Sequence, residues 1–273
     1  MDVEDGKLFY EWMGEGQPLV LIHAGIADHR MWDEQFEVFA RRYRVVRYDL
    51  RGFGQSTTET GSVNYRQDLL DLMKHLGIER AILLGCSMGG SFAIDFALEH
   101  PQMVDALVLS GPGLSGFEHT SGDDPKAQIE KQAFERLEKL WQQRATDEMI
   151  ELELQMWVDG PGQPSERVWP EVRERVRAME ETAYAQNADI KSVRLQPPAA
   201  GRLDEIKAPT LVIVGDLDVT DVLATADNLA EHIRSAKKVI MHGTAHLPNM
   251  ERPDEFTRIV LEFLSNQPLR EAI

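Results

Sequence analysis

The sequence predicts an α/β fold in which helices cover both faces of a mostly parallel sheet. Two observations carry this prediction: short apolar runs alternate with helical patterns, and one long helical stretch interrupts the alternation. The interruption, residues 112–205, is too long for a loop within a compact domain. We therefore expect residues 1–111 and 206–273 to form the core, with residues 112–205 inserted in it as a helical cap.

The first half of the core contains apolar runs typical of strands that are buried on both faces. These runs lie at 18–22, 44–48, 81–84 and 104–109, and helical patterns follow the first three at about 31–39, 65–76 and 88–100. Gly77 is a natural end for the second helix and Pro101 for the third. A strand thus alternates with a helix three times before the insertion begins.

The alternation resumes after the insertion. Strands are predicted at 210–214 and 239–241, and helices at about 221–233 and 253–264. Within the insertion, Phe134, Leu137 and Trp141 share one helical face. An insertion at this place would lie over the carboxyl ends of the strands, where open α/β sheets bind ligands.

The composition limits the class of partner. The chain has 273 residues, 29 of them basic and 46 acidic, for a net charge of −17, which argues against nucleic acid or an anionic membrane as a partner. The single cysteine, Cys86, excludes an intrachain disulfide and a cysteine-based zinc site. No apolar run approaches membrane-spanning length and the first residues lack a signal-peptide core, so we expect a cytoplasmic enzyme. The oligomeric state stays open.

No cofactor or metal is expected. Residues 111–116 match the pattern G-x-G-x-x-G after a predicted strand. The stretch that follows, 117–124, is polar and turn-like, so the helix that a dinucleotide site requires is missing. We interpret residues 111–116 as the hinge into the cap.

The most informative motif is Gly85-Cys86-Ser87-Met88-Gly89, which matches G-x-S-x-G. The pattern alone should occur by chance in roughly one chain in ten of this length. Here a strand-like run precedes it and a helix-like run follows, a context that places the serine on a sharp turn. Ser87 is therefore a candidate nucleophile.

A serine hydroxyl needs an adjacent base, and the base needs a group that orients it. Partners of Ser87 should lie on loops at the same edge of the sheet. Asp216 and Asp218 follow one later strand, and His242 and His246 follow the next. The order serine, aspartate, histidine along the chain is that of the α/β-hydrolase fold.

Several separate motifs agree with that order, and over essentially its whole length the chain resembles a capped member of the α/β-hydrolase superfamily. The motifs are His23-Ala24-Gly25, Asp49 to Ser56, Gly85 to Gly89, Gly215-Asp216-Leu217-Asp218, and Ala245-His246 ahead of Glu251-Arg252-Pro253. Chance agreement of all five, in order and correctly spaced, is negligible.

The resemblance implies a role for each matching residue. Ser87 would attack an acyl carbonyl, His246 would accept and return the proton, and Asp218 would orient the imidazole. The family pattern favours Asp218 over Asp216 and Asp221 as the acid. The N–H of Met88 would be one oxyanion donor.

The second oxyanion donor should come from the loop that begins at His23. Gly25 is the first candidate and Ile26 the alternative, because Ala24 stands where the family usually has glycine. In the cap, Trp141, Met156 and Trp157 are the candidates to line an apolar substrate pocket, although most such residues serve to pack the cap helices together.

The first functional hypothesis is hydrolysis of a small carboxylic ester or lactone through an acyl-serine intermediate. The second is C–C bond cleavage in a β-diketone-like substrate, as in some capped relatives with a similar Ser-Met-Gly-Gly turn. Those relatives commonly have an aromatic residue after the histidine, where this chain has Leu247. Dehalogenase and epoxide hydrolase chemistry is disfavoured, because those relatives have Asp at the position of Ser87. A non-catalytic small-molecule receptor is the third hypothesis.

Overall fold

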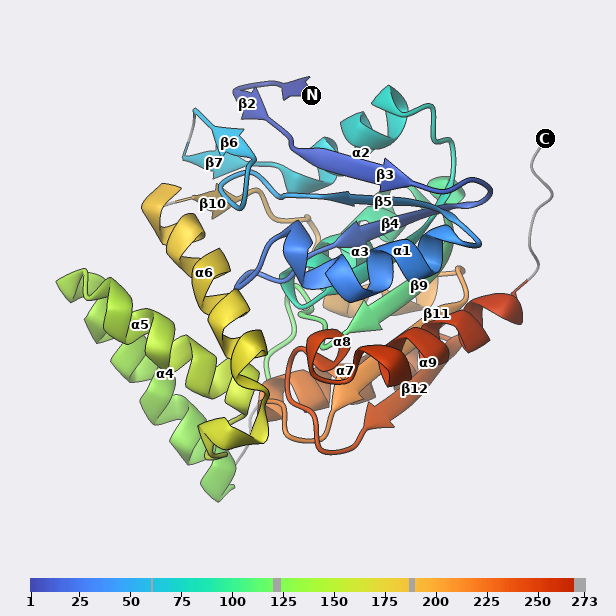
Figure 1. The fold of residues 1–273 in the computed structure, drawn as a ribbon. Coiled ribbons are helices and arrows are strands. Elements are labelled where there is room, and N and C mark those ends of the chain that lie inside the picture. The colour runs from blue at the N-terminus through green and yellow to red at the C-terminus, as the bar shows by residue number, and fades with distance from the viewer. Residues whose placement is uncertain (60, 120–123, 187–189, 268–273) are drawn as a thin grey trace.

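A twisted sheet forms the centre of the molecule. The computed structural model describes residues 1–59, 61–119, 124–186 and 190–267. Within these ranges seven strands form the central sheet, in the spatial order β12-β11-β9-β8-β4-β5-β3 (Figure 1). Their bounds are β3 (Tyr10–Met13), β4 (Pro18–Ile22), β5 (Arg44–Tyr48), β8 (Ala81–Cys86), β9 (Val104–Ser110), β11 (Thr210–Gly215) and β12 (Ala236–Met241). All neighbours are parallel except β3 and β5, which confirms the predicted mostly parallel sheet.

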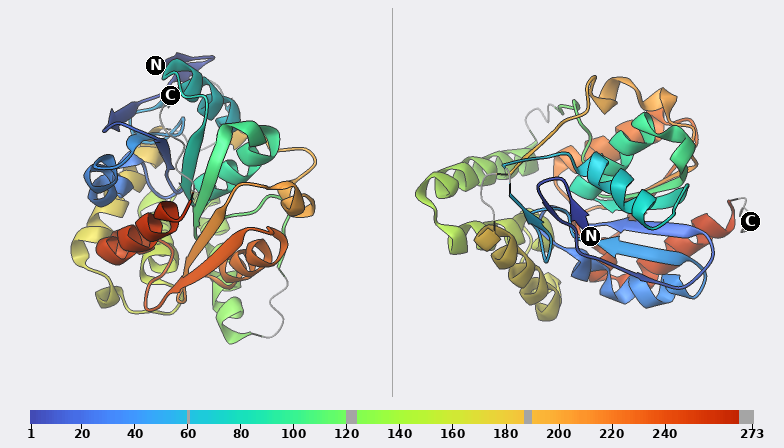
Figure 2. Two further views of the ribbon diagram at one scale, coloured as in Figure 1. Left: turned by 90° about the vertical axis from the view of Figure 1, so that its right-hand side faces the viewer. Right: turned by 90° about the horizontal axis from the view of Figure 1, so that it is seen from above.

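Helices cover both faces of this sheet (Figure 2). Alternate residues of β4 show why its sequence is continuously apolar: Val20 and Ile22 pack into one core, and Leu19 and Leu21 into the other. The first core contains residues of α2 (Tyr65–His75), α3 (Met88–Glu99) and α7 (Thr220–His232), and the second contains residues of α1 (Asp33–Ala40), α8 (Pro248–Glu251) and α9 (Pro253–Ser265).

Two small sheets extend the fold beside the central one. They join β1 (Asp2–Val3), β2 (Gly6–Lys7) and β6 (Thr57–Thr58) in one sheet, and β7 (Ser62–Val63) and β10 (Lys191–Ser192) in the other. The pairing of β10 with β7 is parallel, with Lys191 opposite Ser62. It fixes the chain that returns from the helical stretch against the loop region after β5.

The predicted insertion is mainly helical where the structure describes it, and its last part holds β10 and the 3-10 turns η5 (Ala199–Gly201) and η6 (Leu203–Glu205). It contains α4 (Pro125–Gln143), α5 (Thr146–Glu153), the π-helical turn η3 (Leu154–Asp159), the 3-10 turn η4 (Ser165–Arg167) and α6 (Pro170–Gln186). These helices lie together at one end of the sheet (Figure 1). Residues 120–123 and 187–189 of the predicted cap lie outside the described residues, and the exact cap boundaries, 112 and 205, stay a prediction.

Helices of membrane-spanning character are not found in the described part of the chain. Even α4, with 19 residues, is rich in charged side chains. None of the described helices combines the length and the apolar composition that a bilayer crossing requires.

The parallel strands bring the predicted site residues to one edge. The strands β4, β8, β11 and β12 run in the same direction, so their carboxyl ends lie together. Ser87 directly follows β8, Asp218 lies three residues after β11, and His246 lies five residues after β12. The loop that starts at His23 follows β4, so four separate segments meet at the edge where open sheets bind ligands.

Candidate active site

Ser87 occupies the sharp turn between β8 and α3. Its backbone has φ 53° and ψ −115°, a conformation that non-glycine residues rarely adopt. Such a residue costs about 1–3 kcal/mol and persists only where its surroundings fix it. The Ser87 N–H donates to Ser110 O at 2.9 Å, and its carbonyl accepts from Ser91 N at 3.0 Å and Gly113 N at 3.1 Å. The backbone therefore holds the turn from both sides.

The two glycines of the motif allow this turn to pack closely. A Cβ built at Gly85 would lie 2.4 Å from Gly89 O, and one built at Gly89 would lie 2.5 Å from Ile22 O. Both distances are shorter than real Cβ contacts, and both neighbours are backbone atoms that cannot move aside. The glycines thus permit the start of α3 to lie directly against β8 and β4.

His246 and Asp218 form a buried pair at the same edge. The His246 Nδ1 lies 2.8 Å from Asp218 Oδ2 and 3.0 Å from Oδ1, and the two residues are 2% and 0% exposed. Asp218 Oδ1 also accepts from Val219 N at 2.8 Å. The carboxylate is therefore fixed by its own loop and faces the imidazole.

The competing acidic residues make other contacts. Asp216 accepts from His242 Nδ1 at 2.9 Å and from Gly243 N at 2.6 Å, and the side chain of His242 is 80% exposed. Asp221 lies in the first turn of α7. Among the described residues, Asp218 is the carboxylate that contacts His246.

Gly111 is a site residue that the sequence analysis did not identify as one. A Cβ built there would lie 3.1 Å from His246 Nδ1 and 3.2 Å from Asp218 Oδ2, and its φ is +49°. Its N–H donates to Ile213 O at 2.8 Å, directly beyond the end of β9. The only signal in the sequence was a glycine at the end of a central strand.

The loop after β4 lies against the residue that follows Ser87. A Cβ built at Gly25 would lie 3.5 Å from the Met88 Sδ. His23 holds the loop: its Nε2 accepts from Leu50 N at 2.9 Å, and its Nδ1 lies 2.7 Å from Ala24 O. Burial lowers the pKa of His23, which favours the neutral imidazole that this pair of contacts requires.

A cavity of about 550 Å³ opens beside this loop and below the helices α5 and α6. Gly25 and Met88 line it, together with residues from both sides of the site: Gly52, Phe53, Tyr65, Glu153, Glu180, Ala183, Tyr184, Ile190, Lys191, Ser192 and Arg194. A volume of this size is typical of small-molecule sites.

The three predicted pocket residues are placed differently from one another. Trp141 is 40% exposed on α4 and its ring lies 6.4 Å from that of Tyr184. Met156 is 3% exposed and packs in the first core. None of them is among the residues that line the 550 Å³ cavity.

Trp157 instead contacts the imidazole of His246. The two ring centroids are 4.6 Å apart, and the His246 N–H donates to Trp157 O at 3.2 Å. Trp157 belongs to the π-helical turn η3, a distortion that is frequent at functional sites. Phe134 of α4 lies behind it, with ring centroids 6.0 Å apart.

The helices also contact the two loops that carry Asp218 and His246. Lys126 Nζ of α4 donates to Asp218 O, and the buried Glu130 accepts from Thr220 N at 3.0 Å and from its Oγ1. Glu130 thereby caps the first turn of α7 with a carboxylate, which the helix dipole favours.

Arg167 links the helical segment to the loop of His246. It donates to Asp159 O at 2.6 Å, to Gly243 O at 3.0 Å and to Glu251 Oε2. Glu251 Oε1 in turn accepts from Ala245 N at 2.8 Å, one residue before His246. Burial raises the pKa of Glu251, and the Arg167 guanidinium opposes that rise.

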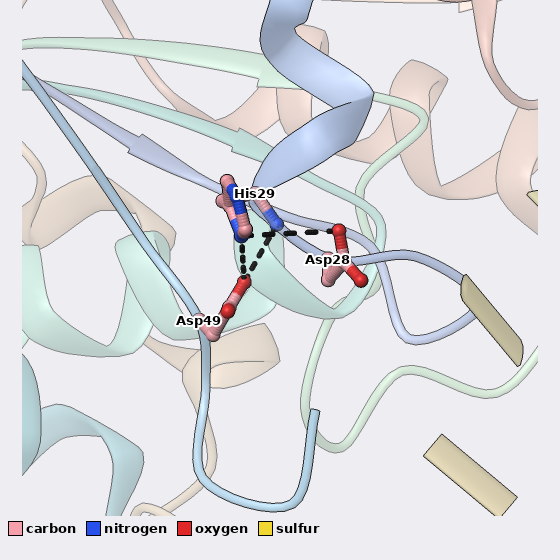
Figure 3. Close-up of side chains that lie close together, drawn as sticks. All are labelled: Asp28, His29 and Asp49. Carbon is pink, nitrogen blue, oxygen red and sulfur yellow. Dashed lines mark hydrogen bonds and ion pairs between the residues drawn. The ribbon is translucent and has the colours of Figure 1, made fainter. Parts of the chain in front are cut away.

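Asp28, His29 and Asp49 lie close together in the structure, as the ligands of a cation would (Figure 3). Its potential ligand atoms lie within 4.8 Å of one another. Asp49 accepts from His29 N and lies against its Nδ1, both at 2.7 Å, and accepts from Gln55 N at 2.8 Å. Asp28 accepts from the guanidinium of Arg30 at 2.6 Å. Backbone N–H groups and the Arg30 guanidinium already contact these carboxylates, so the cluster fits a role in holding the loops together rather than a metal centre.

Comparison with known proteins identifies the family. Residues 17–253 match the model of the alpha/beta hydrolase fold. The chain is 29% identical over 277 aligned residues to a 2-hydroxy-6-oxo-6-phenylhexa-2,4-dienoate hydrolase of Comamonas testosteroni, covering 96% of this chain and 93% of that protein.

Two solved structures are similar along almost the whole chain. The enol-lactonase from Burkholderia xenovorans LB400 has a TM-score of 0.76 at 27% identity, with 96% of this chain and 97% of the other covered. A thermophilic esterase from Thermogutta terrifontis, with malate bound, has a TM-score of 0.76 at 28% identity, with 95% and 93% covered. The chain belongs to the alpha/beta hydrolase family.

Proposed function

We propose that this hydrolase cleaves a carboxylic ester or a lactone through an acyl-serine intermediate, with Ser87 as nucleophile, His246 as base and Asp218 as orienting acid. The buried contact between His246 Nδ1 and Asp218, at 2.8 Å, carries this proposal. It fixes a proton on Nδ1 and leaves Nε2 as the acceptor that a serine hydroxyl needs. The strained turn presents Ser87 at the same edge of the sheet.

The reaction follows from these positions. Ser87 Oγ attacks the carbonyl carbon as its proton passes to His246 Nε2, and Asp218 stabilises the resulting imidazolium. His246 then protonates the departing alcohol, and the acyl group stays on Ser87. A water molecule, activated by the same imidazole, releases the acid and restores the serine.

The negative oxygen of the tetrahedral intermediate needs donors. The Met88 N–H lies at the start of α3, where the helix dipole adds to its attraction for an anion. Gly25 is proposed as the second donor, with Ile26 as the alternative, because Gly25 lies against Met88 and lines the cavity. Loss of one such donor typically costs about 3–4 kcal/mol of transition-state stabilisation.

Hydrolysis of a C–C bond in a vinylogous diketone is a second candidate, and the dienoate hydrolase relative supports it to a comparable degree. Leu247 is an argument against it, since related C–C hydrolases commonly carry an aromatic residue there. The ring of Trp157, 4.6 Å from the imidazole, supplies an aromatic neighbour from another segment. The absence of an aromatic residue at position 247 is therefore a weaker argument against C–C bond hydrolysis than the sequence alone indicates.

A panel of aryl esters, lactones and vinylogous diketones, assayed with the wild type and Ser87→Ala, tests the proposal. We expect turnover of esters or lactones by the wild type and a loss of about 10⁴-fold or more in kcat for Ser87→Ala, with an unchanged circular dichroism spectrum. Turnover of the diketones alone would favour the second candidate. Retention of most ester activity by Ser87→Ala would overturn both.

A further inference from the structure

Two glutamates lie in the wall that α5 and α6 form in the 550 Å³ cavity. Glu153 ends α5, and Glu180 lies in the second half of α6; both line the cavity with Tyr184. Gly25 and Met88, the proposed oxyanion donors, line the same cavity. A group that binds to Glu153 and Glu180 would therefore belong to the substrate whose carbonyl reaches Ser87.

The two carboxyl groups contact each other and have few other partners. Tyr184 Oη donates to Glu153 Oε2 at 2.7 Å. Glu180 is 2% exposed, and neither of its oxygens has a donor among the described residues apart from a proton shared with Glu153. Buried carboxyl oxygens without donors are costly, and a ligand that supplies donors would satisfy them.

The hydrogen bonds of the pair favour a neutral Glu180 beside a charged Glu153. Burial and the neighbouring Glu153 raise the pKa of Glu180 to about 10. Burial also raises the pKa of Glu153, but the hydrogen bonds from Tyr184 and Glu180 oppose that rise and favour the carboxylate. A ligand with one positive charge would neutralise the pair without removing the shared proton. A ligand with a carboxylate would meet a like charge in a weakly screened environment.

The nearby basic residues leave the negative charge of the Glu153 and Glu180 pair largely uncompensated. Arg177 of α6 donates to Glu151, which is its ion-pair partner. Lys191 and Arg194 line the cavity but are exposed, so water and salt screen their charges. The buried pair should dominate the charge preference of the cavity.

We propose that Glu153 and Glu180 form a recognition subsite for a positively charged nitrogen, a primary ammonium, on the acyl part of the substrate. This inference rests on the proposed function, because it assumes that the acyl group occupies the cavity beside Gly25 and Met88. The net charge of −17 would also attract cationic substrates toward the molecule.

Three 4-nitrophenyl esters that differ only at the end of the acyl chain test the proposal: 6-aminohexanoate, heptanoate and the monoester of pimelate. We expect the wild type to prefer the ammonium ester over heptanoate by about 10- to 100-fold in kcat/KM, as charge-assisted hydrogen bonds to a buried group would give. The pimelate ester should be the poorest substrate.

Two variants separate charge from shape. Glu180→Gln imitates the protonated side chain, so the preference should persist, whereas the double variant Glu153→Gln/Glu180→Gln should lose it. Glu181→Gln, at an exposed neighbour outside the cavity, should behave as the wild type. A wild-type preference for heptanoate or pimelate, or a preference that survives in the double variant, would overturn the proposal.

The outcomes also distinguish this inference from the proposed function. Hydrolysis of heptanoate without a preference for the ammonium ester would remove the subsite and leave the serine mechanism intact. If no ester is hydrolysed, a binding measurement tests the subsite. Hexylammonium should raise the melting temperature of the wild type more than hexanol does, whereas the two compounds should raise that of the double variant equally. Equal shifts in the wild type would overturn the subsite.

Discussion

The sheet edge and the helices α4 to α6 hold their functional groups by different means. At the edge, Ser87 is fixed by three backbone hydrogen bonds, and glycines allow segments to approach closely. In the helical segment, charged side chains such as Arg167 and Glu130 make the contacts, and the Glu180 oxygens lie buried without a hydrogen-bond donor from the described basic residues. If the proposed function holds, the difference teaches that backbone geometry positions the reacting groups, whereas single side chains of the helical segment select the substrate.

The largest expected effect comes from the acid at the sheet edge. Asp218→Asn keeps the size of the side chain but removes the charge that orients and stabilises the His246 imidazolium, so we expect kcat to fall about 10⁴-fold. Steady-state kinetics on the best ester of the panel measures it.

Asp216→Asn is the matched control for that variant. Asp216 contacts His242 and Gly243 rather than His246, so its loss should change kcat less than about threefold. A larger loss for Asp216→Asn than for Asp218→Asn would exchange the roles assigned to the two residues.

The next effect tests backbone packing at the same edge. Gly111→Ala places a Cβ 3.1 Å from His246 Nδ1, on a backbone with φ +49°. Because this distance is shorter than most real Cβ contacts, the imidazole must shift by a few tenths of an ångström. Small misplacements of catalytic groups cost up to ~10²-fold, and we expect kcat to fall by 10- to 100-fold.

Gly113→Ala provides the comparison, because a Cβ there meets Ser91 Cβ at an ordinary 3.6 Å. It should retain nearly full activity. Equal kcat values for the two alanine variants would show that the close approach of Gly111 to the imidazole does not affect catalysis.

A smaller effect concerns the contacts between the helices and the loops. Arg167→Ala removes the donors to Gly243 O and Glu251, so the loop of His246 should loosen and kcat should fall about 10-fold. Arg175→Ala removes a different ion pair, to Glu34 of α1 at 2.7 Å, and should leave kcat unchanged. Matching losses in the two variants would mean that Arg167 acts only through general stability.

The smallest effect is a pH dependence of stability in the helices. The folded-state pKa of Glu180, about 10, lies above the ordinary value of 4.5, so the folded chain binds more protons than the unfolded chain between these values. This contribution to stability is full below pH 4.5 and is lost as the pH rises toward 10. Glu153, Arg177 and Tyr184 face the same group and shape its titration.

Glu180→Gln removes that titration, so its melting temperature should exceed that of the wild type by at least ~2 °C at pH 9, with a smaller difference at pH 5. Calorimetry at pH 5, 7 and 9 measures it, with Glu181→Gln as the reference. Parallel curves for the wild type and Glu180→Gln would contradict the raised pKa.

Much of the fold was predictable because the buried strands carry continuous apolar runs. Val20 to Ile22 and Leu211 to Val214 pack against helices on both sides, and this two-sided burial is visible in the sequence. The antiparallel edge strand β3 was missed: Trp12 is 53% exposed and Met13 42%, so it has no such run.

The site was predictable where local geometry requires particular residues. Glycines around Ser87 and the order of Asp218 and His246 left a pattern, because the turn and the sheet edge demand them. The contacts of Trp157, Arg167 and Glu180 could not be predicted, because they depend on how separate helices pack. No spacing in the sequence records that Trp157 faces His246.

The central claim is that Ser87 forms a covalent bond with the acyl group. An aryl phosphonate that reacts with activated serines, followed by digestion and mass spectrometry, tests it most directly. We expect one phosphonyl adduct, located on Ser87 and absent from Asp218→Asn at the same reaction time. An active enzyme that remains unlabelled, or an adduct on another residue, would contradict it, and an unlabelled protein without esterase activity would instead favour a receptor.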